Sequence, residues 1–428
     1  MTTSPLAVHG GEPVRTKPWP AWPQSTPATL SMLGEVLESG RWAISAPYAG
    51  ARSFERRFSD AFCLFNACRF CVPTSSGTTS LMVALEACGV GAGDEVIIPG
   101  LTWVANASAV AAVNAKPVLA DIHPETLCMD PESVRARIGP RTKAITVVHL
   151  YSAVADLDAL ASIARQHGLV LIEDCAQVHG ARYRDRTVGT FGAMGTFSMQ
   201  ATKVLTSGEG GAVITNDADL ARRAEHLRAD GRCYGRDTPA VGTMELVETA
   251  DVMGHNYSLS EFQSAVLLAQ LQMLPQQNEI RARNAALLDR LLTNCGLTPQ
   301  LTSPGTTSRT YYQYAALLPP DMVAQADLGT IAAALRAELG LSIAGGYSPL
   351  NTNRLYDPHT RRRFTELAGQ DLSIQGHSLP VTEDIIGRLL TFHHAGLLGD
   401  ETDMNDIAEA VIKVADNLAA LAKTELRV

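Results

Sequence analysis

The sequence has few aromatic residues, no excess of positive charge and no long hydrophobic run. Phe, Trp and Tyr make up 6% of its 428 residues, whereas hydrophobic residues make up 46%, so Ala, Val and Leu must fill most of a core. The 35 basic residues are outnumbered by 44 acidic ones, which argues against binding nucleic acid or an anionic membrane. No apolar stretch approaches the roughly 18 residues of a membrane span, and the N-terminus lacks the apolar segment of a signal peptide.

The eight cysteines are widely spaced and follow no disulfide framework, which predicts a reducing compartment and a cytoplasmic location. Cys68 and Cys71 form an isolated C-x-x-C pair without a second pair of ligands, so we expect a structural role for them. His393 and His394 are adjacent and belong to no H-E-x-x-H motif. No metal site is therefore predicted.

Five prolines between residues 10 and 30 exclude a long helix or a central strand there. We expect residues 1–30 to form an extended arm that lies over the body of the protein or over a partner subunit. Beyond it, short β-rich runs alternate with helical stretches such as Ser80–Cys88 and Asp156–His167. The expected strands are Arg69–Pro73, Glu95–Pro99, Pro117–Asp121, Ala144–Leu150, Leu169–Glu173, Thr196–Met199 and Ala212–Thr215. This alternation predicts an α/β fold with a mainly parallel seven-stranded sheet covered on both faces.

From Leu259 onward the pattern becomes mostly helical. Two long helices are expected, over Glu261–Leu274 and Ile280–Leu292, followed by a strand over Tyr311–Leu317 and a helix near Leu328–Leu339. The chain closes with a helix whose apolar positions recur at spacings of three and four; these are Ile407, Val411, Val414, Leu418 and Leu421. We therefore expect a large α/β domain over residues 31–270 and a smaller C-terminal α+β domain over residues 271–428.

A turn rich in hydroxyl groups, Ser75-Ser76-Gly77-Thr78-Thr79, separates an expected strand from an expected helix. Free backbone N–H groups and the helix dipole make such a turn a site for an anion, typically phosphate. The alternative is an ordinary helix N-cap, where Ser and Thr are preferred. This motif alone does not decide between the two.

Two carboxylates, Glu173 and Asp174, close the apolar strand that begins near Leu169. Ligands of doubly wound sheets bind at the carboxyl ends of strands. Because alternate residues point to opposite faces, only one of these two acids can face the same crevice. The alternative is a pair of solvated acids at the end of a strand.

Lys203 is the one charged residue between Gly192 and Gly208. The uncharged surroundings predict a desolvated site, in which a lysine amine becomes nucleophilic. The alternative is a surface lysine that covers apolar side chains with its stem. Taken together, an anion cradle, a carboxylate at a strand end and a buried lysine match the requirements of pyridoxal 5'-phosphate: the lysine holds it as a Schiff base, and the carboxylate pairs with its pyridine nitrogen.

With these motifs the sequence resembles the DegT-type sugar aminotransferases, a family of fold-type-I pyridoxal-phosphate enzymes, from the Pro-rich arm to the last helix. Further segments resemble the glutamine-dependent aminotransferases that act on 2-deoxy-scyllo-inosose or scyllo-inosose in aminoglycoside biosynthesis. The family motifs are Ser76-Gly77-Thr78, Glu173-Asp174-Cys175-Ala176-Gln177, Ser198 to Lys203, Ser207-Gly208-Glu209-Gly210-Gly211 and Gly254-His255-Asn256-Tyr257. The segments that resemble the cyclitol aminotransferases are Gly40-Arg41-Trp42-Ala43-Ile44-Ser45, Pro99-Gly100-Leu101-Thr102-Trp103-Val104, His149-Leu150-Tyr151-Ser152-Ala153-Val154-Ala155-Asp156 and Phe392-His393-His394.

The resemblance implies a role for each matching residue. Lys203 would bind the cofactor and shuttle the proton, and Asp174, in preference to Glu173, would pair with the pyridine nitrogen. Trp103 would stack on the cofactor ring, unless it is a core aromatic, and Gln177 would lie near the phenolic oxygen. The phosphate would be bound by Ser76, Gly77, Thr78 and Ser198, and by Asn256 of a neighbouring subunit in a homodimer. Tyr347 is the expected substrate contact.

The resemblance also leaves alternatives. Many members that act on nucleotide sugars carry a basic residue where this chain has Ser258, which favours a neutral keto-cyclitol over a nucleotide-linked keto-sugar. Related dehydratases replace the cofactor lysine with histidine, so Lys203 favours transamination with L-glutamine as donor. Scyllo-inosose and 3-amino-2,3-dideoxy-scyllo-inosose remain alternative acceptors. A pyridoxal-phosphate-binding regulator without catalysis is the remote alternative.

Overall fold

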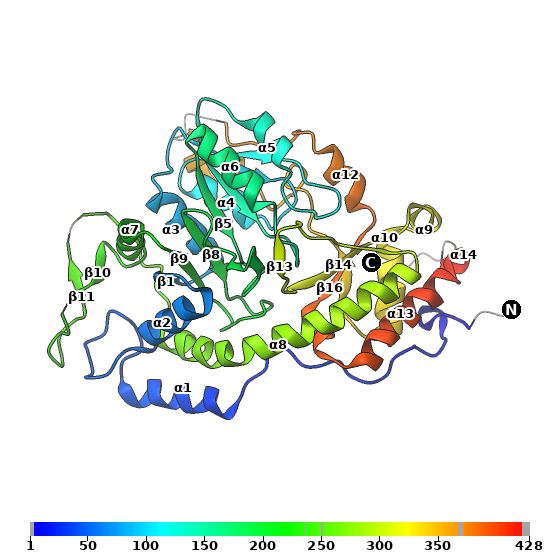
Figure 1. Cartoon of the computed structure of the whole chain (residues 1–428), viewed down its shortest axis with the longest axis horizontal. Helices are drawn as coiled ribbons and strands as arrows, with labels where there is room; N and C mark the ends of the chain where they lie inside the picture. Colours follow the sequence, from blue (N-terminus) through cyan, green and yellow to red (C-terminus); the bar gives the residue numbers. More distant parts are fainter. Residues whose placement is uncertain (1–3, 236, 250, 367–370, 422–428) are drawn as a thin grey trace.

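A seven-stranded sheet forms the centre of the computed structural model, which describes residues 4–235, 237–249, 251–366 and 371–421 (Figure 1). In spatial order its strands are β1 (Phe70–Thr74), β9 (Gly211–Thr215), β8 (Met194–Ser198), β5 (Val170–Asp174), β4 (Thr142–Val148), β2 (Glu95–Pro99) and β3 (Lys116–Ala120). Only β9 runs antiparallel to its neighbours. The predicted mainly parallel seven-stranded sheet and α/β class are confirmed.

The sheet forms because its strands bury apolar side chains on both faces. In β2, Ile97 packs in one core with α2 (Phe54–Asn66) and α6 (Leu157–His167). Its neighbours Val96 and Ile98 pack in another core with α3 (Gly77–Ala87) and α4 (Ala105–Ala112). Alternate residues of a strand point to opposite faces, so this helix–sheet–helix sandwich follows from a continuous apolar run.

One helix replaces the two that were expected beyond Leu259, so that prediction was wrong. α8 runs unbroken over Glu261–Asn294 and contains Pro275. A proline in a helix removes one backbone hydrogen bond, but α8 lies against α1 (Pro27–Ser39), α2 and α13 (Glu401–Ala415) along its length (Figure 1). This packing outweighs the lost bond. The proposed domain boundary at residue 270 falls inside α8.

The C-terminal part is built on a second sheet, in the order β12 (Thr298–Pro299), β14 (Gln313–Leu317), β16 (Leu389–His393) and β15 (Ile343–Gly345). α10 (Leu328–Leu339) and α13 pack beside it. The five apolar positions of the expected last helix are all buried, but that helix breaks after Ala415 and resumes as α14 (Leu418–Leu421). Residues 422–428 lie outside the described part of the chain.

The remaining elements lie around these two sheets. They are η1 (Ala7–His9), α5 (Pro131–Arg137), β6 (Arg182–Tyr183), β7 (Arg186–Thr187), α7 (Ala218–Arg228), β10 (Arg232–Tyr234), β11 (Leu246–Glu248), β13 (Thr306–Ser308), α9 (Pro320–Gln325), η2 (Pro358–Thr360), α11 (Arg362–Glu366), α12 (Pro380–Ile386) and η3 (His394–Leu398). Among the described residues, no helix combines the length and hydropathy needed to cross a membrane.

The N-terminal arm runs over the body of the same chain, with little regular structure, from the C-terminal part towards α1 (Figure 1). Leu6, which is 1% exposed, packs with Leu288 of α8 and Leu418 of α14. α1 begins at Pro27, inside the range expected for the arm.

Candidate active site

A cavity of about 380 Å³ opens where the loops after β1, β2, β5 and β8 meet. Nine of the ten predicted site residues line it, and the exception is Asn256. The nine are Ser76, Gly77, Thr78, Trp103, Asp174, Gln177, Ser198, Lys203 and Tyr347. Residues more than 270 positions apart in the sequence are thus brought to one place, at the strand ends where ligands of α/β sheets bind.

The anion cradle is the start of α3. Ser76 Oγ accepts a hydrogen bond from the Thr79 N–H at 3.1 Å, and Thr79 Oγ1 accepts one from the Ser76 N–H at 3.0 Å. The predicted N-cap therefore exists, and it leaves the first N–H groups of the helix, at Gly77 and Thr78, without a helical partner. A Cβ on Gly77 would lie 2.6 Å from the Ser198 Cβ. Only glycine lets Ser198 approach this helix end.

The two strand-end acids have different environments. Asp174 lines the cavity, whereas Glu173 is fully buried on the other face of β5. The Glu173 carboxylate accepts three backbone N–H hydrogen bonds at 2.6–2.7 Å, from Gly189, Phe191 and Gly192. Glu173 is therefore occupied in holding the turn before β8, and Asp174 is the acid that faces a ligand.

Asn106 was not predicted from the sequence as a site residue. Its Nδ2 donates to Asp174 Oδ2 at 2.9 Å, while the Ala176 N–H donates to Asp174 Oδ1 at 3.0 Å. Asn106 lies in the first turn of α4, four residues after Thr102, whose Oγ1 also accepts from Asn106 Nδ2 at 3.3 Å. These two donors fix the orientation of the Asp174 carboxylate.

Lys203 is half-buried in the loop between β8 and β9, and its Nζ lies 3.9 Å from the centroid of the Tyr312 ring. The Tyr312 hydroxyl also lies 3.1 Å from Thr202 Oγ1. Burial raises the pKa of Tyr312, but the Lys203 charge and hydrogen bonds from neighbouring side chains outweigh it, so the net direction is downward. Tyr312 was not predicted as a site residue, because the sequence pattern of its tyrosine-rich segment indicates only a strand.

Gln177 and Tyr347 are both held by Tyr151. The Tyr151 N–H donates to Gln177 Oε1 at 2.5 Å, and the Tyr151 hydroxyl accepts from the Tyr347 N–H at 3.0 Å. The Tyr151 and Tyr347 rings stack with centroids 5.5 Å apart, and Gln177 Nε2 lies 3.5 Å from the Tyr347 hydroxyl. Burial raises the pKa of Tyr347 well above its ordinary value, so its hydroxyl stays protonated.

Trp103 lies at the cavity wall and is 50% exposed, which excludes the alternative of a core aromatic. Its ring centroid is 5.8 Å from that of Tyr347.

Asn256 lies outside the cavity and is exposed in the single chain. The carbonyl of the next residue, Tyr257, accepts from the Ser75 N–H at 2.7 Å, beside the anion cradle.

These residues fit pyridoxal phosphate. The N–H groups of Gly77 and Thr78 and the close approach of Ser198 form a cradle for its phosphate. Asp174 is oriented to accept a hydrogen bond from its protonated pyridine nitrogen, and Lys203 reaches the same cavity.

Comparison with known proteins agrees with this geometry. The DegT/DnrJ/EryC1/StrS aminotransferase family matches residues 24–411. The chain is 64% identical to the L-glutamine:2-deoxy-scyllo-inosose aminotransferase of Micromonospora echinospora, over 96% of this chain and 98% of that protein. It is 51% identical to the L-glutamine:scyllo-inosose aminotransferase of Streptomyces griseus, over 98% of this chain and 100% of that protein.

A solved structure, that of 3-amino-5-hydroxybenzoic acid synthase, superposes with a TM-score of 0.80 at 29% identity and covers 94% of this chain and 100% of the other. Pyridoxal phosphate is thus the cofactor, and the protein is an enzyme that transfers amino groups. With the family match spanning most of its length, the chain belongs to the DegT/DnrJ/EryC1/StrS aminotransferase family.

Proposed function

We propose that this enzyme transfers the amino group of L-glutamine to 2-deoxy-scyllo-inosose and forms 2-deoxy-scyllo-inosamine in aminoglycoside biosynthesis. The observation that carries this proposal is the 64% identity, over nearly the whole chain, to a protein named for that reaction. The cavity supports it, because Lys203 and Asp174 line the same cavity. The reaction takes place in the cytoplasm.

The bound cofactor supplies an electron sink that makes the α-proton of the donor acidic. The Lys203 amine removes that proton in the first half of the reaction and returns a proton in the second half. The Asp174 carboxylate, oriented by Asn106, would accept a hydrogen bond from the pyridine nitrogen of the cofactor. Gly77, Thr78, Ser76 and Ser198 hold the phosphate.

The cavity wall suits a neutral polyol. Beyond the cofactor residues it presents the hydroxyls of Thr102, Thr202, Tyr312 and Tyr347 and the amide of Gln200. Within the described part of the chain, Lys203 is the one basic residue that lines it. A nucleotide diphosphate needs cationic partners, so this lining favours a cyclitol ketone, with Tyr347 as a contact.

The active unit is a homodimer with shared sites. Asn256 is exposed beside the anion cradle, where a second subunit can use it. Several large apolar side chains are also exposed in the single chain, among them Trp42 at 53% and Met253 at 86%. Contact with a second subunit would bury such side chains.

A competition assay tests the acceptor. The enzyme is incubated with L-glutamine and equal amounts of 2-deoxy-scyllo-inosose, scyllo-inosose and a nucleotide-linked keto-sugar, and the products are separated by mass. We expect 2-deoxy-scyllo-inosamine as the main product. Scyllo-inosamine as the main product would reassign the acceptor, turnover of only the nucleotide sugar would reject the cyclitol, and no product from any acceptor would favour a regulator.

A further inference from the structure

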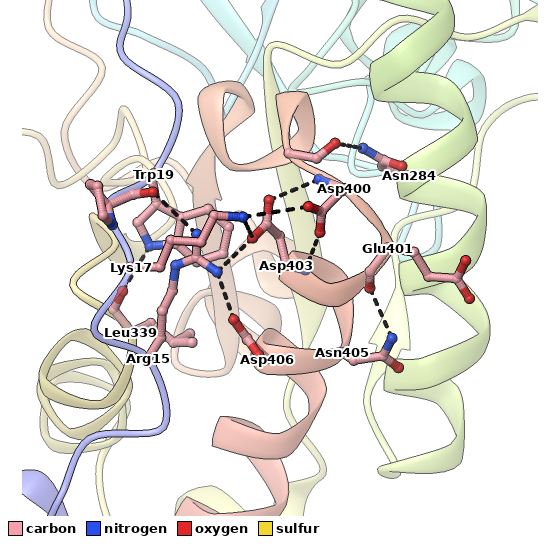
Figure 2. A network of polar contacts seen from close by, with 12 residues as sticks. Arg15, Lys17, Trp19, Asn284, Leu339, Asp400, Glu401, Asp403, Asn405 and Asp406 are labelled. Carbon is pink, nitrogen blue, oxygen red and sulfur yellow. Dashed lines mark hydrogen bonds and ion pairs between the residues drawn. The ribbon is translucent and has the colours of Figure 1, made fainter.

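The N-terminal arm is fixed to the C-terminal part by a buried ion pair. Arg15 Nη1 lies 2.6 Å from both Asp403 Oδ1 and Asp406 Oδ2 of α13 (Figure 2). The Arg15 guanidinium also stacks on Trp19 at 3.9 Å from the ring centroid, and Trp19 Nε1 donates to the Leu339 carbonyl at 2.7 Å. The arm therefore leaves this anchor in a defined direction.

Three residues after Trp19, the arm reaches the loop that carries Lys203. Trp22 Nε1 donates to the Ala201 carbonyl at 3.1 Å, two residues before the lysine. The next contact fixes the arm to α8, where Gln277 Nε2 donates to Gln24 Oε1 at 3.0 Å. The contacts of Trp19 and Gln24 thus fix the arm before and after Trp22, whose indole contacts the loop.

A second pair of side chains holds the next carbonyl of the loop. His393 Nε2 and His394 Nε2 lie 3.0 and 3.1 Å from the Thr202 carbonyl oxygen. His393 Nδ1 accepts from the Ala395 N–H at 3.2 Å, so its Nε2 carries the proton and donates. The ring of His394 packs edge-to-face on Trp22, with centroids 4.5 Å apart.

The loop needs such support. Residues 199–210, between β8 and β9, form neither helix nor strand. A small displacement of a catalytic group costs a large factor in rate, and the long side chain of Lys203 would transmit any movement of its backbone. Two successive carbonyls held from two directions fix the backbone immediately before the lysine.

We propose that Trp22 of the arm is a positioning residue for Lys203, acting together with His393 and His394 through the carbonyls of Ala201 and Thr202. The inference rests on the proposed function in one respect, the role of Lys203. The arm is then part of the catalytic apparatus, although it touches neither cofactor nor substrate. The alternative is that Trp22 only contributes packing.

Trp22→Phe tests the inference, because it keeps the ring packing and removes the N–H donor. We expect kcat to fall at least about tenfold, with KM for L-glutamine nearly unchanged. Trp19→Phe is the matched control, since it removes the same donor in the same arm from a contact away from the loop; we expect it to leave kcat within about twofold.

A second readout does not depend on the loaded enzyme. In cofactor-free protein, reductive methylation with formaldehyde and a hydride reports the accessibility of each lysine by mass spectrometry. Relative to exposed Lys143, Lys203 should react faster in Trp22→Phe than in wild type and in Trp19→Phe. His393→Leu should behave like Trp22→Phe, whereas His393→Gln, which keeps a donor, should retain most activity.

Equal kcat and equal methylation of Lys203 in wild type and Trp22→Phe would overturn the inference. Equal losses in Trp22→Phe and Trp19→Phe would also overturn it, because a general loss of packing would then explain both. If instead hydride reduction of the loaded wild-type enzyme attached no cofactor to Lys203, the proposed function itself would fail. The two failures are therefore distinguishable.

Discussion

Glu173 and Asp174 are neighbours in the sequence and point to opposite faces of the sheet, where they do different work. The Glu173 carboxylate, fully buried, accepts N–H groups of the turn before β8 at 2.6–2.7 Å. The Asp174 carboxylate faces the cavity and accepts from Asn106 Nδ2 at 2.9 Å. Glu173 therefore stabilises the fold, whereas Asp174 belongs to the active site.

Substitution of each acid by its amide should separate these roles. Asp174→Asn removes the charge opposite Lys203 and should lower kcat/KM by about 10²–10³, as the loss of one preorganised electrostatic partner does, with a small effect on unfolding. Glu173→Gln keeps the shape but loses a charged acceptor, so the free energy of unfolding should fall by about 2 kcal/mol. Urea unfolding and steady-state kinetics measure both. The reverse pattern would contradict the assignment.

Asn106→Ala removes a donor to Asp174 and leaves the cavity otherwise intact. Loss of one hydrogen bond to a charged group corresponds to about 1.5–3 kcal/mol, so we expect cofactor affinity to fall at least about tenfold. Equilibrium titration of the cofactor-free protein, followed by its absorbance, gives the affinity. Asn405→Ala, on the exposed face of α13, makes the same chemical change and should bind the cofactor like wild type. An unchanged affinity in Asn106→Ala would refute the role of Asn106.

Tyr312→Phe keeps the ring beside the Lys203 Nζ and removes the hydroxyl. Because the Lys203 charge lowers the pKa of Tyr312, ionisation of this phenol should shape the alkaline limb of the pH–rate profile. In Tyr312→Phe that limb should move to higher pH, and kcat should fall by about 10², the lower end of the range for loss of a group that assists proton transfer. Tyr356→Phe, whose hydroxyl donates to the Leu372 carbonyl, is the control. An identical alkaline limb in Tyr312→Phe and wild type would contradict this prediction.

Gly77→Ala tests the anion cradle. The added Cβ would lie 2.6 Å from the Ser198 Cβ, so the start of α3 or Ser198 must move. We expect weaker binding of cofactor and of inorganic phosphate, by about tenfold or more, since a displacement at this contact also moves the N–H groups that hold the anion. Gly34→Ala in α1, where an added Cβ meets nothing within 4 Å, should bind both normally. Equal affinities in the two variants would exclude a tight cradle at Gly77.

The sequence predicts the central sheet well because each buried strand is a continuous apolar run between turn signals. All seven expected strands are present. Glu95–Pro99 has the expected bounds, and the ends of the other strands differ from the expected ones by no more than two residues. Pro275 misled the prediction of α8, because local propensity favours a break while packing against α1, α2 and α13 keeps the helix whole. Tertiary contacts of this kind are not visible in a single sequence.

The candidate site likewise has residues that the sequence predicts and residues that it does not. Motifs of consecutive residues, such as Ser76-Gly77-Thr78, predict positions that do line the cavity. Asn106 and Tyr312 carry no local signal, and Tyr151 belongs to a motif that assigns it no role. The roles of all three come from the contacts that they make across the fold. The same holds for Trp22, whose contact with Ala201 spans 179 positions of sequence.

An isotope label can follow the amino group from L-glutamine to the cyclitol. The enzyme is incubated with L-glutamine labelled with ¹⁵N at the α-amino group and with 2-deoxy-scyllo-inosose, and the product is analysed by mass spectrometry. We predict ¹⁵N-labelled 2-deoxy-scyllo-inosamine with the wild-type enzyme and none with Lys203→Ala. Unlabelled amino-cyclitol would rule out L-glutamine as the amino donor, and labelled product formed equally well by Lys203→Ala would rule out the role of Lys203.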